Sequence, residues 1–184
     1  MPIVRPTREQ LLAAHGRRVP DLIGPGMKAL FVGINPSVYS AAVGHHFARP
    51  GNRFWPALHA GGLTPRVLRP DEEGELLALG FGITNVVSRA TVAADELEPQ
   101  EYVAGATQLV RKVRRYKPRV VAFLGMGAYR TAFGVRDAAL GLQDLSLGGR
   151  PVWVLPNPSG LNAHYQLPAL ARLYAQAREF ALGL

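Results

Sequence analysis

Four short apolar runs, separated by segments of helical character, constrain the fold of this chain most strongly. The runs cover residues 29–34, 81–87, 120–124 and 152–155. The longest intervening segment runs from Pro99 to Lys117 and repeats apolar residues at alternating spacings of three and four, as a helix with one buried face does. Strands that are apolar throughout and alternate with helices are typical of a parallel sheet covered on both faces. We therefore predict an α/β fold, a three-layer α/β/α sandwich with a mostly parallel central sheet.

Length and composition favour one domain over residues 1–184. The chain is 48% hydrophobic and long enough for a sizeable core, and no linker, internal repeat or low-complexity tract divides it. No apolar run approaches the roughly 20 residues of a membrane span, and the first residues lack the apolar stretch of a secretory signal. Because there is no cysteine, disulfides, thiolate metal sites and iron–sulfur clusters are excluded. We expect a cytoplasmic protein with no membrane partner.

The charge of the chain points to an anionic partner. Lys and Arg number 21 against 13 Asp and Glu, which gives a formal net charge of +8. Such a balance favours nucleic acid, although a GC-rich coding sequence would also raise the Arg content everywhere. The densest basic segment, residues 111–119, lies mostly opposite the apolar stripe of its helix, so we interpret it as a solvated face.

The tripeptide Asn-Pro-Ser follows two of the predicted strands, at residues 35–37 and 157–159. Ligands of open α/β sheets bind outside the carboxyl ends of the strands, so the two segments could line one pocket. The amide of Asn35 both donates and accepts hydrogen bonds and could hold a water or a ligand amide, but it is not a true general base. The alternative is an Asx-turn that closes the strand.

Residues 39–51 have no clear period and contain several glycine or proline breaks, so we expect an ordered loop. Residues 44–55 read Gly-His-His-Phe-Ala-Arg-Pro-Gly-Asn-Arg-Phe-Trp. Neighbouring histidines normally point apart and no carboxylate stands near them in the sequence, so we expect no metal site. Phe47 lies among glycine and polar residues, where its ring could cover a flat ligand by stacking.

Leu161 is an apolar residue between Gly160 and Asn162. This arrangement suits a wedge that enters a base stack and holds a nucleotide out of it. The alternative is an ordinary turn with the Leu161 side chain tucked under it.

Together, residues 31–37, 44–55 and 155–161 closely resemble the mismatch-specific uracil-DNA glycosylase and thymine-DNA glycosylase branch of the uracil-DNA glycosylase superfamily. The similarity runs from about Pro20 to the last helix. It implies a monomeric enzyme with no metal and no cofactor, acting on double-stranded DNA that contains a mispaired or damaged pyrimidine. Such an enzyme flips uracil, and by extension thymine or other damaged pyrimidines, out of a mispair with guanine and hydrolyses its N-glycosidic bond. A bacterial enzyme of this kind would associate with the nucleoid.

The resemblance also implies roles for individual residues. Asn35 would position the attacking water, while the backbone around Ile34 and Phe47 would contact the pyrimidine and the Phe47 ring would stack on it. Ser40 matches a small residue that leaves the pocket open to larger pyrimidines. The residues implied for the wedge and its DNA contacts are Asn157, Ser159, Gly160, Leu161 and Asn162.

The chain departs from the family pattern at two positions. Asn85, which we include among the substrate-binding residues, stands where a Lys is usual. Ala163 stands two residues after the wedge leucine, where many relatives carry Arg. Fewer contacts to the opposite strand would relax the preference for a mispair, unless another side chain such as His164 compensates.

Asp95 is a second candidate catalytic residue. It lies in the loop after the second strand, whose carboxyl end should open on the same crevice. A carboxylate there would activate the water or order the DNA backbone. The alternative is an acid that flanks the helix beginning at Pro99.

Two other functions are consistent with these patterns. A non-catalytic module could bind damaged DNA without cleaving it. A nucleotide-binding α/β enzyme could use the turn Gly125-Met126-Gly127, although Arg130 stands where the dinucleotide fingerprint needs a third glycine.

Overall fold

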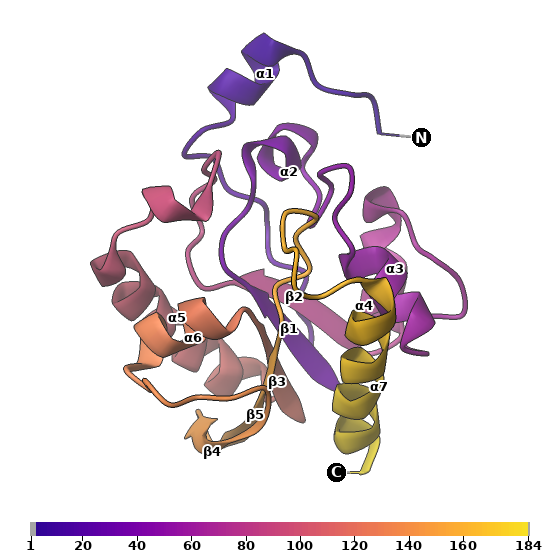
Figure 1. Ribbon diagram of the computed structural model, residues 1–184, viewed down its shortest axis with the longest axis vertical. Coiled ribbons are helices and arrows are strands. Elements are labelled where there is room, and N and C mark those ends of the chain that lie inside the picture. The colour runs from indigo at the N-terminus through magenta and orange to yellow at the C-terminus, as the bar shows by residue number, and fades with distance from the viewer. Residues whose placement is uncertain (1–2, 184) are drawn as a thin grey trace.

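A five-stranded sheet lies between two layers of helices in the computed structural model, which describes residues 3–183 (Figure 1). The strand order is β2-β1-β3-β5-β4, in which the first four strands are parallel and β4 runs antiparallel to β5. The predicted α/β/α sandwich with a mostly parallel sheet is therefore confirmed. The strands are β1 (Ala29–Gly33), β2 (Phe81–Asn85), β3 (Val120–Leu124), β4 (Gly141–Leu147) and β5 (Arg150–Leu155).

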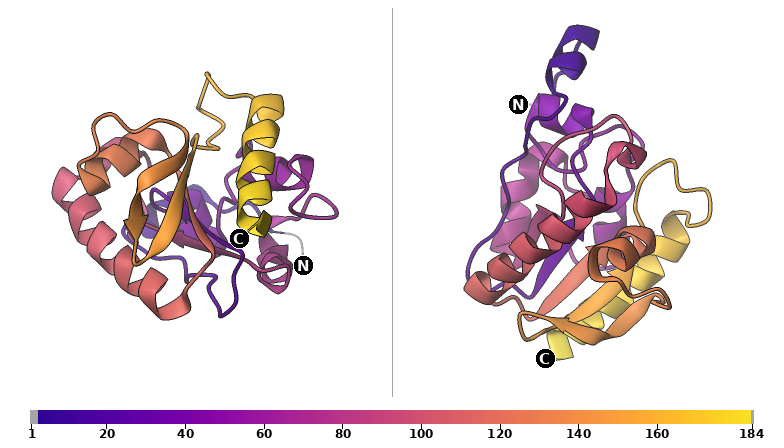
Figure 2. Two further views of the ribbon diagram at one scale, coloured as in Figure 1. Left: turned by 90° about the horizontal axis from the view of Figure 1, so that it is seen from below. Right: turned by 90° about the vertical axis from the view of Figure 1, so that its left-hand side faces the viewer.

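The two helical layers lie on opposite faces of the sheet (Figure 2). One layer contains α5 (Pro99–Tyr116) and α6 (Met126–Phe133). The other contains α3 (Phe54–Ala60), α4 (Glu73–Ala78) and α7 (Leu167–Gly183). No helix within residues 3–183 is long and apolar enough to cross a membrane. The remaining elements are α1 (Arg8–Ala13), α2 (Val38–Val43) and the 3-10 helices η1 (Pro70–Glu72) and η2 (Ala94–Glu96).

Strand β1 shows why the predicted strands are apolar throughout. All five of its residues are buried, and successive side chains of a strand point to opposite faces. Phe31 packs with α3 and α7, whereas Leu30 and Val32 pack with the residues of α5 and α6. Both faces of the strand therefore need apolar side chains.

Helix α2 and strand β4 were missed by the sequence prediction. Residues 39–51 were expected to form a loop, but they include most of the six-residue helix α2. Ser37 caps this helix by accepting a hydrogen bond from the amide of Ser40, and Gly44 ends it in the left-handed conformation at φ +79°. Strand β4 pairs only with β5 at the edge of the sheet and exposes much of its length, so it lacks the apolar run that marked the other strands.

The strand order places the carboxyl end of β1 at a topological switch point. The chain leaves β1 to form β2 on one side of it and returns to form β3 on the other. The loops that follow β1 and β3 therefore diverge and leave a crevice between them, which is where ligands bind in open α/β sheets.

Candidate functional site

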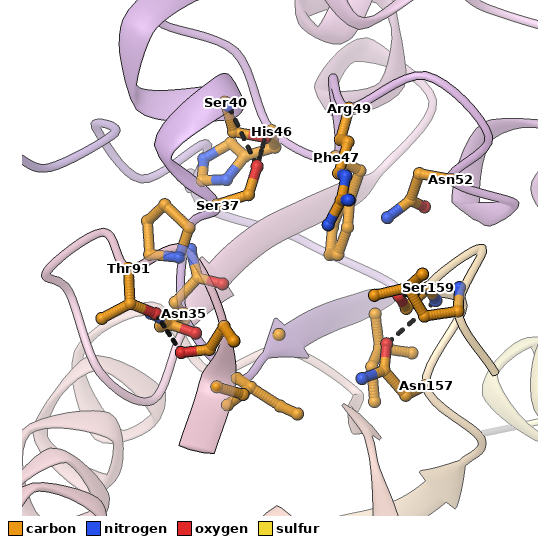
Figure 3. A pocket seen from close by; sticks show the side chains of 18 of the residues that line it. Asn35, Ser37, Ser40, His46, Phe47, Arg49, Asn52, Thr91, Asn157 and Ser159 are labelled. Atoms are coloured by element: carbon orange, nitrogen blue, oxygen red, sulfur yellow. Dashed lines mark hydrogen bonds between the residues drawn. The ribbon is translucent and has the colours of Figure 1, made fainter. Parts of the chain in front are cut away.

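A cavity of about 300 Å³ opens at this switch point (Figure 3). Its floor is formed by residues at the ends of β1, β2 and β3, and its rim by loops that follow β1, β2 and β5. Both Asn-Pro-Ser segments contribute, with Asn35 and Asn157 on opposite sides of the cavity. The two segments therefore lie around one cavity, as predicted from the strand ends.

The orientation of the Asn35 amide is fixed by the loop after β2. Its Nδ2 donates to the carbonyl oxygen of Arg89 at 3.0 Å and to the hydroxyl of Thr91 at 2.8 Å. The Thr91 hydroxyl in turn donates to the carbonyl of Ala93 at 2.8 Å, so it must accept from Asn35. A carbonyl oxygen can only accept, which places the amide nitrogen on this side. Within residues 3–183 no group donates to Asn35 Oδ1, so this oxygen is free to accept a hydrogen bond from a ligand or a water.

The loop that holds Asn35 is itself anchored to α5. Arg89 binds both carboxylate oxygens of Glu101, at 2.6 and 2.8 Å, and its Nη2 donates to the carbonyl of Glu96 at 3.0 Å. The hydrogen bonds from Arg89 lower the pKa of Glu101 to about 2, so the pair stays ionised over the physiological range. The side chain of Arg89 therefore holds in place the residue whose backbone carbonyl accepts from Asn35.

Phe47 forms the opposite wall of the cavity in a strained backbone conformation. Its φ is +52°, a region that residues other than glycine rarely adopt. Phe54 stacks on its ring with centroids 4.0 Å apart at 26°, so Phe54 covers one ring face and the other is available to a flat ligand. Gly33 makes room for this arrangement, since a Cβ there would lie 2.5 Å from Asn85 Oδ1 and 3.2 Å from Phe47 Cζ.

Glu73 of α4 holds the segment that contains the two histidines. One carboxylate oxygen accepts from His45 Nδ1 at 3.1 Å, and the other accepts from the backbone amide of His46 at 3.0 Å. A carboxylate thus lies beside the histidines in space although none stands near them in the sequence. Within residues 3–183, no three His, Asp or Glu side chains form a group that could hold a metal ion.

His46 lines the cavity as a neutral side chain. Its Nε2 lies 2.8 Å from the carbonyl of Pro20, which can only accept, so Nε2 carries the proton. Burial lowers the pKa of His46, against the opposing effect of nearby Glu73. The indole of Trp55 donates to the His46 carbonyl at 3.1 Å and fixes the backbone at this point.

Ser40 is buried in the wall of the cavity, and its hydroxyl is used for structure. The oxygen accepts from the backbone amide of Ala48 at 3.1 Å and from the hydroxyl of Ser37 at 3.1 Å. These bonds join α2 to the segment that carries Phe47. These bonds could not be expected from the sequence, because they depend on helix α2, which was not predicted.

Residues 157–165, called the wedge loop here because they include the predicted wedge, have a shape set by their own side chains. Asn157 Oδ1 accepts from the amide of Ser159 at 3.0 Å, and the Asn157 carbonyl accepts from the side chain of Asn162 at 3.0 Å. The Ser159 hydroxyl accepts from the amide of Leu161 at 3.3 Å. The Leu161 side chain is 76% exposed, and the loop projects from the body of the molecule (Figure 2). Leu161 is therefore not tucked under the turn.

Most of the predicted site residues meet at the cavity. Gly160 and Asn162 lie beside it in the wedge loop. Asp95 does not line it: this exposed residue lies on η2, next to Ala94, which does. The predicted residues that line the cavity are Ile34, Asn35, Ser40, Phe47, Asn85, Asn157, Ser159 and Leu161.

Sequence reasoning missed Arg89 and Thr91, which orient Asn35 from more than 50 residues away. No local signal in the sequence could have identified a backbone carbonyl as the partner. The glycine-rich turn 125–127 contributes nothing to the cavity lining, to which this part of the chain adds only Leu124.

Comparison with known proteins shows the fold and the family of this chain. The solution NMR structure of a candidate uracil DNA glycosylase from Methanosarcina acetivorans shares the fold, with a TM-score of 0.62 and 20% sequence identity over 89% of this chain and 97% of the other. The sequence profile of the uracil DNA glycosylase superfamily matches residues 20–179. The chain therefore belongs to the uracil DNA glycosylase superfamily, whose members are DNA glycosylases that act on damaged bases.

Proposed function

We propose that this chain removes uracil from guanine mispairs in double-stranded DNA, and extends to thymine or other damaged pyrimidines. The base is flipped into the cavity, and a water oxygen bonds to C1′ of the sugar as the bond from C1′ to the base breaks. The bonding electrons leave with the base, which ends with a proton that the water loses. The whole site lies in one chain, which is consistent with a monomer.

The observation that carries the proposal is the fixed amide of Asn35. Because its nitrogen is engaged by Arg89 and Thr91, its oxygen is left to accept a hydrogen bond from a water. An acceptor held in this way orients a water lone pair without an entropic cost at the moment of reaction. Opposite it, the free face of Phe47 offers a stacking surface for the flipped base.

Chemistry at this site depends on positioning more than on proton abstraction. No Asp or Glu is among the residues that line the cavity in the described part of the chain. An amide does not remove a proton from water, so we expect the chemical step to be slow. Excision would then depend on how easily the mispaired base leaves the stack.

Asp95 remains a second proposal for water activation or for ordering the DNA backbone. Its exposed place on η2 would require the loop to move before the carboxylate met a water in the cavity. Excision by Asn35→Ala and Asp95→Asn should be compared on one uracil duplex. If only Asn35→Ala loses activity, Asp95 has no part in the chemistry.

The absence of a carboxylate from the lining favours a second candidate function, a module that binds flipped bases without cleaving them. One set of oligonucleotides separates the two candidates. Each carries a single uracil, thymine or other damaged pyrimidine, in single-stranded form and opposite each base. Alkali-dependent strand scission strongest opposite guanine supports the glycosylase, whereas binding with no alkali-labile site supports the module. Equal scission opposite adenine and guanine contradicts the mispair preference.

A further inference from the structure

We propose that Arg53 is a positioning residue that holds the wedge loop in the shape needed to enter DNA. Arg53 lies directly before α3, more than 100 residues from the loop in sequence. The inference rests on the proposed function, because a wedge is needed only if the protein flips bases.

The Arg53 guanidinium faces a ring of backbone carbonyls in the wedge loop. Its Nη1 lies 2.9 Å from the oxygen of Asn162, 3.1 Å from that of Tyr165 and 3.3 Å from that of Ser159. Its Nη2 lies 3.3 Å from the oxygen of Gly160. A guanidinium presents its donors in a rigid plane, so one side chain binds both arms of the loop at once.

No acid competes for this side chain. Within residues 3–183, no ion pair is formed by Arg53, whereas other arginines such as Arg66 and Arg89 bind carboxylates. Hydrogen bonds from a charged donor are about twice as strong as those between neutral groups. The charge-assisted hydrogen bonds of Arg53 therefore go to backbone carbonyls of the wedge loop and stabilise its shape.

Backbone contacts from the same segment reinforce this attachment. The amide of Arg53 donates to the carbonyl of Pro158 at 2.9 Å. Gly160 packs so closely on Gly51 that a Cβ at position 160 would lie 2.5 Å from the Gly51 oxygen. The loop is thus seated on residues 51–53 at Pro158 and Gly160, while the side chain of Leu161 stays exposed.

A rigid wedge loop loses its conformational freedom when the protein folds rather than when it binds DNA. A flexible loop would lose conformational freedom when it entered DNA, and that loss would weaken binding. Arg53 makes the loop ordered before DNA arrives. The effect of Arg53 should therefore appear in base flipping and act through Leu161.

The first experiment measures amide hydrogen exchange in the free protein, which does not depend on any activity. Arg53→Lys keeps the positive charge but cannot reach both arms of the loop. We expect exchange in residues 157–165 to rise at least about 10-fold, the change that follows from losing roughly one charge-assisted hydrogen bond, with exchange in β1 and β3 unchanged. Arg111→Lys, on the exposed face of α5, is the matched control. Unchanged exchange in the loop would overturn the proposal.

The second experiment measures single-turnover excision of uracil from a duplex with guanine opposite. We expect Arg53→Lys to be about 10-fold slower than the parent on the same basis. Added to Leu161→Ala, it should cause little further loss, because both changes disable the same wedge. Full additivity would show that Arg53 acts elsewhere. If the parent protein cleaves none of the oligonucleotides, the proposed function fails, and hydrogen exchange alone decides whether Arg53 orders the loop.

Discussion

The two Asn-Pro-Ser segments have the same sequence and opposite local architectures. Asn35 directs its nitrogen to a loop from another part of the chain and keeps its oxygen free. Asn157 uses its oxygen to accept from Ser159 within its own loop. Ser37 caps a helix, whereas Ser159 accepts from the amide of Leu161.

The difference shows that the surroundings determine which end of an asparagine amide is available. The first segment leaves β1, an interior strand of the sheet, and meets the anchored loop after β2, which supplies acceptors for Nδ2. The second segment leaves β5 and folds back on itself, so the side-chain oxygen and the backbone carbonyl of Asn157 both accept hydrogen bonds within the loop. We therefore expect the first segment to take part in the reaction and the second to set the shape of the wedge loop.

The largest expected effect is the loss of excision in Asn35→Ala. Removing the acceptor that orients the water should slow single-turnover excision about 100-fold, the size of effect that follows when a reacting group loses its position. The fold should persist, which circular dichroism and thermal melting would check. A loss equal to that of Asn157→Ala would contradict the division of roles.

Asn157→Ala should have the next largest effect. Losing the bond to the Ser159 amide loosens the wedge loop, and we expect excision from a guanine-mispaired duplex to fall about 10-fold, equivalent to about 1.4 kcal/mol. Excision from an unpaired uracil in a bubble needs no wedge and serves as the control. An equal loss on both substrates would mean that Asn157 acts in the cavity itself.

The two serines give a smaller contrast, measured as stability. Ser37→Ala removes the cap of α2 and should lower the free energy of unfolding by about 1 kcal/mol. Ser159→Ala removes only one long bond in an exposed loop and should cost about 0.5 kcal/mol or less. Urea denaturation of both variants tests this order, and the reverse order would contradict it.

The smallest expected effect is a loss of stability in acid. It would arise from protonation of His46, which lies beside Phe47. Burial lowers the pKa of His46, so below pH 6.5 the unfolded chain binds more protons than the folded protein. Stability is therefore undiminished above pH 6.5 and falls as the pH drops from there to the lowered pKa. The melting temperatures of the parent and of His46→Gln should be measured between pH 7.5 and 5. The difference between the two proteins should be smaller at pH 5 than at pH 7.5. Parallel curves would contradict the role of His46.

The sheet was predictable because burial on both faces leaves a direct mark on the sequence. Each of the four apolar runs became a strand, with ends that differ by no more than two residues. Helix α2 was not, because six residues provide less than two turns of periodicity. Strand β4 was hidden by the polar residues that an exposed edge strand carries, such as Gln143 and Asp144.

The site was predictable where a side chain faces the cavity from a strand end, as Asn35 does. It was not predictable where its geometry depends on distant backbone groups. The carbonyl of Arg89 orients Asn35, and the guanidinium of Arg53 binds carbonyls of the wedge loop, yet neither interaction requires a particular residue type at the acceptor. Such contacts follow from the path of the folded chain and leave no local pattern.

The close approach of Gly160 to Gly51 has a further consequence for how far the wedge loop can move. Where two backbones touch with no side chain between them, neither can shift without carrying the other. We therefore expect the backbone at Gly160, next to Leu161, to keep its position relative to Gly51. If this chain flips bases as proposed, its DNA would meet a wedge loop whose backbone is already in place.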